Sequence, residues 1–353
     1  MERMRTLYRE VAGQLEQVEF HRLWPGFRPY PFALYTEETV WLAERTLPRG
    51  EAFRGNTAIS FQGSPLAIWQ IETGTEPDPV GLAADLVHEM FHAFQMEQGE
   101  ARFPDDLAAL DDSPDAAAIS HKLAENRLLA QVLLAGDQGE AHSCLEVLCT
   151  LRERRLGGQM AYELLAETVE GTAEYVGTQA LAQLDSQRYR QRLEVLVRRL
   201  GEASPLLLDV RRLAYCTGTA LLLAAEKAGL DLRHQLAGET RPIYTLLRER
   251  VADREAPEVP ADPAVEALLR DQRRERQEIL RQFFRRAAQP EAGDFVICGY
   301  DPMNLFPCGK LLYGSHFWLL QNRETGEQIT LTGEAVLVRT GVRQVSRYWR
   351  AQP

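Results

Sequence analysis

The chain has 353 residues, 45% of them hydrophobic, so we expect a packed core rather than a disordered chain. Its formal net charge of −11 at pH 7 argues against a nucleic-acid partner, because phosphate binding needs a dense basic surface. The five cysteines are irregularly spaced and make a poor disulfide framework, and the sequence lacks an apolar run of the roughly 20 residues needed to span a bilayer. These features predict a soluble, cytoplasmic protein with no membrane partner.

The N-terminal part of the chain reads as a short helix followed by strands. Residues 5–18 are amphipathic and predict the helix. Residues 32–42 (FALYTEETVWL) predict two short strands, and residues 56–71 (NTAISFQGSPLAIWQI) predict a hairpin that turns at Gln62-Gly63-Ser64. The β-branched and aromatic content of these runs favours a sheet.

A longer helix is predicted to begin at Pro79 and to end near Gln98. Asp78 can cap it, and proline at the first helical position loses nothing by lacking an N–H group. Gly99 is a plausible stop. The segment 101–117 that follows is acidic and contains two prolines, which predicts a loop.

Beyond this loop, residues 118–250 are predicted to be mostly helical, with Leu and Ala at helical spacings. Residues 251–262 read as a linker, and a helix is expected from Pro263 to about Gln289. Its arginines alternate with acidic residues, which favours a solvated connecting helix over one that binds nucleic acid or membrane. From residue 293 to the end the β pattern returns.

Residues 88–92 (HEMFH) form an HExxH motif on the predicted helix. His88 and His92 share one helical face, and neutral imidazole nitrogens are good zinc ligands. Glu89 follows the first histidine, where it can act as a general base without binding the metal. The alternative is a pair of core histidines with satisfied hydrogen bonds, since apolar residues flank the motif.

A third ligand is expected on the later helix at residues 162–177 (YELLAETVEGTAEYVG). One face of this helix carries four carboxylates, namely Glu163, Glu167, Glu170 and Glu174. Such a stripe is either a solvated acidic face or a set of carboxylates gathered by a cation. Gly171 and Ala173 favour the cation, because small residues let two helices approach closely around a metal.

HEMFH followed by EGTAEY resembles the gluzincins, the thermolysin-like branch of the zincin metallopeptidases, over roughly residues 50–180. The resemblance implies a peptide or protein substrate and one zinc ion as cofactor. It also implies His88, His92 and Glu170 as metal ligands and Glu89 as the catalytic base. Glu174 would then orient one ligand histidine from behind.

Several features lie outside this resemblance. The glycine and histidine that continue the motif in metzincins are replaced by Gln95 and Gln98, which excludes that branch. The GxMEN motif of many aminopeptidase gluzincins is absent, so exopeptidase and endopeptidase action both stay open. Glu163 and Glu167 would be left as surface or supporting charges.

A zinc hydrolase also needs a donor for the developing oxyanion. Tyr215 begins a segment that resembles the Tyr-xx-Gly-x-Ala helix of several zincin families, and we place it ahead of His234, although either can have a purely structural role. Residues 56–61 could form an edge strand that pairs with an extended peptide, or an ordinary paired strand. Cys298, Cys308 and His316 match no structural zinc spacing.

The sequence therefore predicts an α+β protein with a small N-terminal sheet, a mainly helical body and a compact C-terminal β unit. Residues 1–250 would form a zincin-like metallohydrolase domain, 251–292 a linker and connecting helix, and 293–353 the β-rich unit. The first alternative is a non-catalytic zincin-like protein that binds a metal or a partner. The second is a helical di-iron carboxylate protein, for which the required second Glu-x-x-His motif is missing. The oligomeric state stays open.

Overall fold

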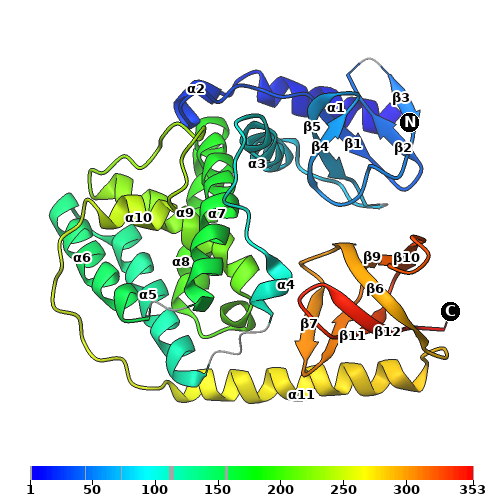
Figure 1. Cartoon of the computed structure of the whole chain (residues 1–353). Helices are drawn as coiled ribbons and strands as arrows, with labels where there is room; N and C mark the ends of the chain where they lie inside the picture. The colour runs from blue at the N-terminus through cyan, green and yellow to red at the C-terminus, as the bar shows by residue number, and fades with distance from the viewer. Residues whose placement is uncertain (1, 44, 73, 111–114, 156–157, 353) are drawn as a thin grey trace.

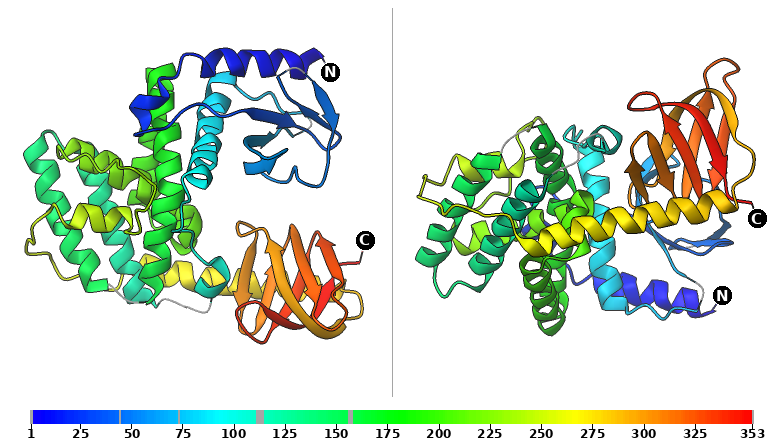
Figure 2. Two further views of the ribbon diagram at one scale, coloured as in Figure 1. Left: turned by 45° about the horizontal axis from the view of Figure 1, so that its top comes forward. Right: turned by 90° about the horizontal axis from the view of Figure 1, so that it is seen from below.

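The computed structural model describes residues 2–43, 45–72, 74–110, 115–155 and 158–352 (Figure 1). An N-terminal sheet and a C-terminal sheet lie on the same side of a helical body (Figures 1 and 2). This arrangement confirms the predicted α+β class, with the described strands lying in residues 32–70 and 291–350. None of the described helices is long and apolar enough to cross a membrane.

The N-terminal sheet has the strand order β3-β2-β1-β5-β4, in which β1 and β5 run parallel and the other pairs are antiparallel. Its strands are β1 (Phe32–Tyr35), β2 (Thr39–Trp41), β3 (Thr46–Pro48), β4 (Thr57–Phe61) and β5 (Ser64–Gln70). The predicted hairpin is confirmed: Gln62 and Gly63 join β4 to β5 with φ of 53° and 82°, as a tight two-residue turn requires. The β4 strand forms one edge of the sheet. Strand β3 was not predicted.

Helices α1 (Glu2–Leu15) and α3 (Pro79–Glu97) lie beside this sheet, whereas the short helix α2 (Phe20–Leu23) contacts the helical body. The predicted start of α3 is confirmed, since the Asp78 carboxylate accepts a hydrogen bond from the Gly81 amide at 2.7 Å. The apolar side of α3 packs on β5 and β4, and Phe91 contacts Trp24 and Phe27 edge to face. This packing fixes the helix rotation and leaves the HExxH face toward the helical body.

The helical body is built from α5 (Ala116–Leu134), α6 (Gln138–Arg155), α7 (Gly158–Leu184), α8 (Ser186–Gly201), a 3₁₀ turn (Pro205–Leu208), α9 (Val210–Lys227) and α10 (Ile243–Arg248). The expected loop at 101–117 is wrong in part, because it contains the short helix α4 (Asp106–Ala109) and the start of α5. The Asp105 carboxylate caps α4. Residues 111–114 of that segment lie outside the described residues.

Helix α7 packs between α3 and α9. In each of these two contacts, a glycine of α7 allows the neighbouring backbone to approach closely. A Cβ atom on Gly171 would lie 2.5 Å from the Cα atom of Gly218 on α9. A Cβ atom on Gly177 would lie 2.8 Å from the Ala84 carbonyl oxygen on α3. Gly171 was expected to let two helices approach closely around a metal. It instead allows α9 to pack closely on α7, and Gly177 is the residue that allows α7 to approach the motif helix α3.

Residues 251–262 form neither helix nor strand, and α11 (Pro263–Arg285) then runs from the helical body along the C-terminal sheet (Figure 2). We call residues 291–351 the C-terminal β unit. Its antiparallel sheet has the order β10-β9-β6-β12-β11-β8-β7. The strands are β6 (Glu291–Tyr300), β7 (Leu305–Cys308), β8 (Leu311–Gly314), β9 (Phe317–Asn322), β10 (Gln328–Thr332), β11 (Ala335–Arg339) and β12 (Gln344–Arg350). Leu107 of α4 is buried in the core of this unit.

Candidate metal centre

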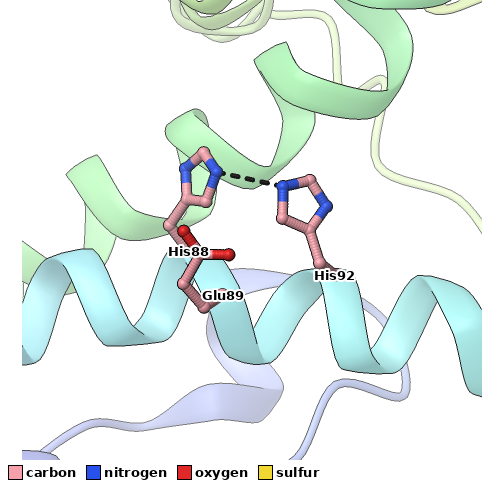
Figure 3. Close-up of side chains that lie close together, drawn as sticks. All are labelled: His88, Glu89 and His92. Atoms are coloured by element: carbon pink, nitrogen blue, oxygen red, sulfur yellow. Dashed lines mark hydrogen bonds between the residues drawn. The ribbon is translucent and has the colours of Figure 1, made fainter. Parts of the chain in front are cut away.

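The two motif histidines rise from the same side of α3, with Glu89 between them (Figure 3). Their Nε2 atoms are 3.1 Å apart. One possible ligand atom from each of His88, Glu89 and His92 lies within 4.8 Å of the other two, and among the described residues this is the group able to hold a metal ion. Helical spacing alone produces this arrangement, so the sequence was sufficient to predict it.

The orientation of His88 is set by Glu174 on α7. The Nδ1 atom of His88 lies 3.1 Å from Oε2 of Glu174, which is hydrogen-bond distance. An ionised carboxylate has no proton to donate, so it can only accept this hydrogen bond. Burial alone would raise the pKa of Glu174, but the hydrogen bond to His88 lowers it below its ordinary value. His88 therefore donates from Nδ1, and its neutral form carries the lone pair on Nε2.

The orientation of His92 is set by Gln95, a residue that the sequence analysis did not single out for the site. The Gln95 amide nitrogen donates to the Val169 carbonyl at 3.0 Å and to the Thr172 hydroxyl at 3.1 Å. Its amide oxygen must then face His92, whose Nδ1 lies 2.7 Å away and donates to it. His92 consequently also presents a lone pair from Nε2.

Glu170 on α7 is the candidate for a third ligand, although it is not one of the three residues whose ligand atoms lie within 4.8 Å of one another. Its Oε1 accepts a hydrogen bond from Arg211 at 2.6 Å. Its Oε2 is buried, has no hydrogen-bond partner among the described residues, and lies 3.3 Å from Nε2 of His92. Burial alone would raise the pKa of Glu170, but His92 and then Arg211 lower it, so the carboxylate stays ionised. A buried acceptor without a donor costs about 1–3 kcal/mol, which a cation would offset.

The separations of His88 and Glu170 from Nε2 of His92 match those between ligands of a zinc ion. Once both rings are neutral, each Nε2 atom can present a lone pair to one shared cation. Ligand atoms about 2.0–2.1 Å from a tetrahedral zinc lie about 3.3–3.4 Å from one another. The observed separations are 3.1 Å between the two imidazoles and 3.3 Å between His92 and Glu170. Two nitrogens and one oxygen leave the fourth position open, as in catalytic zinc sites.

Glu89 and Tyr215 complete the surroundings. Burial raises the pKa of Glu89 above its ordinary value, with His88 and His92 opposing the shift. The Tyr215 ring stacks on the His88 ring, with centroids 5.6 Å apart and 3° between the planes. Burial and then the Glu170 charge raise the pKa of Tyr215, which keeps its hydroxyl protonated and able to donate.

His234, the other candidate donor, lies elsewhere. Its Nδ1 is 2.9 Å from the Leu232 carbonyl oxygen and its ring packs edge to face on Trp24. Trp24 in turn packs on Phe91, which belongs to the buried apolar side of α3. The structure thus brings Tyr215 to His88 and places His234 in the packing behind the motif helix.

The acidic stripe on α7 is divided between two environments. Glu170 and Glu174 face the histidines, whereas Glu163 and Glu167 are buried in a separate ion network. Their partners are Lys122, Arg152 and Arg155. Of the two roles expected for these positions, surface charge or supporting charge, the surface role is wrong, because both side chains are buried and three basic side chains from neighbouring helices neutralise them inside the body.

Within the described part of the chain, Cys298, Cys308 and His316 are not among the residues whose ligand atoms gather closely enough to hold a metal ion. Cys298 is exposed, and His316 Nδ1 lies 2.6 Å from the Asp301 carboxylate.

Comparison of the chain with protein-family models, curated proteins and solved structures finds no match. The resemblance to gluzincins therefore depends on the two short motifs and on the geometry described above.

Proposed function

We propose that the protein is a zinc-dependent hydrolase that cleaves peptide or similar amide bonds. The observation that carries the proposal is that the two imidazole Nε2 atoms lie 3.1 Å apart, with the buried Oε2 of Glu170 3.3 Å from that of His92 and with Glu89 beside the two rings. A purely structural zinc would normally have four protein ligands and would not need a base next to it.

Bound zinc would polarise the scissile carbonyl and lower the pKa of a water molecule beside it. Glu89 would accept a proton from the attacking water and then deliver it to the leaving nitrogen. A raised pKa suits a carboxylate that must both take up and release a proton. Tyr215, protonated and packed on His88, would donate a hydrogen bond to the carbonyl oxygen as negative charge develops.

The position of β4 supports a peptide substrate. This strand is an edge of the N-terminal sheet and packs on α3, the helix that carries the motif. An extended peptide could add to the edge through main-chain hydrogen bonds, which would bring its backbone past the two histidines.

The test measures metal and activity together. Purified wild type should contain about one zinc per chain, and a chelator should abolish cleavage of a quenched-peptide library until zinc is restored. His92→Ala and Glu170→Ala should lower zinc occupancy, whereas Glu194→Ala, at an exposed position on α8, should not. A wild type that takes up no zinc would contradict the proposal. One that holds zinc but cleaves neither peptides nor other amides would favour the non-catalytic metal-binding alternative.

A further inference from the structure

Asp106 joins three parts of the fold at one carboxylate. It begins the four-residue helix α4. Its Oδ1 accepts hydrogen bonds from Tyr162 on α7 and from Arg211 on α9, each at 2.6 Å. Its Oδ2 accepts a longer one, at 3.4 Å, from the Tyr300 hydroxyl at the end of β6. The carboxylate therefore links α7 and α9 to the C-terminal β unit.

Arg211 extends this link to the metal centre. One of its terminal nitrogens donates to Asp106 and the other to Oε1 of Glu170, both at 2.6 Å. Because a guanidinium is planar and rigid, fixing one end fixes the other. With Oε1 held by Arg211, it is Oε2 of Glu170 that faces His92. Arg211 thus selects the carboxylate oxygen that can reach a metal.

The C-terminal β unit determines where α4 lies. A helix of four residues has too few internal hydrogen bonds to hold its own position. Leu107 is fully buried among the unit's core side chains, which include Phe295 and Trp318. Arg343 of the unit pairs with Asp105, the residue that caps α4, at 3.3 Å. The unit therefore contacts the residue before Asp106, through the Arg343–Asp105 ion pair, and the residue after it, through the packing of Leu107.

We infer that the C-terminal β unit is a working part of the metal site, because it positions Glu170 through Tyr300, Asp106 and Arg211. The inference rests on the zinc site proposed above and goes beyond it by giving a function to residues 291–351. These three residues are positioning residues, since each acts on the metal through Glu170. The unit is then no independent module: its attachment to α4 should tune zinc affinity.

The test uses the full-length protein and reads out the metal itself. Zinc affinity is measured by competition with a chromophoric chelator, and ligand geometry by the visible spectrum of the cobalt-substituted protein. Asp106→Ala should weaken zinc binding about 10–100-fold, the range for outer partners of metal ligands. Tyr300→Phe should act in the same direction but less, since its hydrogen bond is long. Both should shift the cobalt spectrum.

Tyr348→Phe is the matched control, because this hydroxyl donates to Glu291 within the β unit. Thermal denaturation of all variants separates metal effects from unfolding. Unchanged affinity and an unchanged cobalt spectrum in Asp106→Ala and Tyr300→Phe would overturn the inference and leave the proposed zinc site standing. Equal losses in Tyr348→Phe would overturn it too, by indicating general destabilisation. A wild type that takes up no zinc would overturn both proposals, and neither readout depends on turnover.

Discussion

The amide oxygen of Gln95 lies 2.7 Å from Nδ1 of His92 and determines which nitrogen of that ring can bind a metal. The amide is locked from its other end, because its nitrogen donates to Val169 and Thr172 on α7. Gln95 is completely buried, so water does not compete for these contacts. The residue that replaces the metzincin glycine therefore leaves a lone pair on Nε2 of His92, the nitrogen that lies 3.1 Å from His88.

Gln95→Leu should weaken zinc binding about 10–100-fold, as loss of an outer hydrogen-bond partner typically does. Leucine has a similar size but cannot accept the proton on Nδ1, so His92 is free to adopt the tautomer with Nε2 protonated. Chelator competition measures the change. Gln131→Leu, at an exposed position on α5, is the control and should retain wild-type affinity. Equal affinities in the two variants would show that Gln95 has only a packing role.

Much of the centre could be predicted because it is encoded locally. The spacing of His88 and His92 places both rings on one helical face. Asp78 caps the helix by accepting a hydrogen bond from the amide of Gly81, only three residues along the chain. The two glutamates of EGTAEY repeat the same spacing on α7. Likewise, the hairpin at Gln62 follows from its turn residues and its alternating strands.

The missed residues act through contacts that span long stretches of chain. Gln95 reaches Thr172 across 77 positions, and Arg211 reaches Asp106 across 105. No local pattern encodes such pairs. Helix α4 was not predicted, because it has only four residues and its position depends on packing against the C-terminal β unit. Nothing in the sequence around Gly177 indicates its role, which depends on the close approach of the α3 backbone at Ala84.

Gly177→Ala should destabilise the fold and weaken zinc binding together. Its new methyl group would lie 2.8 Å from the Ala84 carbonyl oxygen and 3.3 Å from the His88 Cβ atom, so α7 must move away from α3. Overpacking of this kind costs about 1–3 kcal/mol. Thermal denaturation and chelator competition measure the two effects. Gly13→Ala in α1, where a Cβ meets no atom within 4 Å, should leave both unchanged or slightly raise stability.

Zinc binding should release a proton from His88. Burial alone would lower the pKa of this histidine, but the hydrogen bond to Glu174 and the nearby carboxylates raise it to about 9 in the metal-free protein. The ring is then protonated at pH 7, and zinc must displace that proton to reach Nε2. Apparent zinc affinity should therefore rise as the pH rises toward 9, by about tenfold per pH unit for one proton released.

Calorimetric titration of zinc at pH 7, in buffers with different ionisation enthalpies, counts the protons released. A count near zero would mean that the metal does not bind through His88.

Tyr215→Phe should lower kcat about 10²–10³-fold, the usual cost of removing one oxyanion donor. Phenylalanine can keep the stacking on His88, so zinc affinity should stay close to that of the wild type. Steady-state kinetics with a cleaved peptide and zinc titration separate the two properties. A parallel loss of zinc would instead assign Tyr215 to holding the histidines in place.

Glu89→Gln should retain zinc and lose turnover. Glutamine has nearly the same shape, so the packing of α3 and the positions of His88 and His92 should persist. It cannot accept a proton from the attacking water, and loss of a general base typically costs about 10²–10⁴-fold in rate. The measurement pairs zinc stoichiometry with kcat on the same preparation, and His92→Ala, which removes a ligand, should lose both. Wild-type turnover in a zinc-replete Glu89→Gln protein would remove the base from the mechanism, even if the metal centre itself is correct.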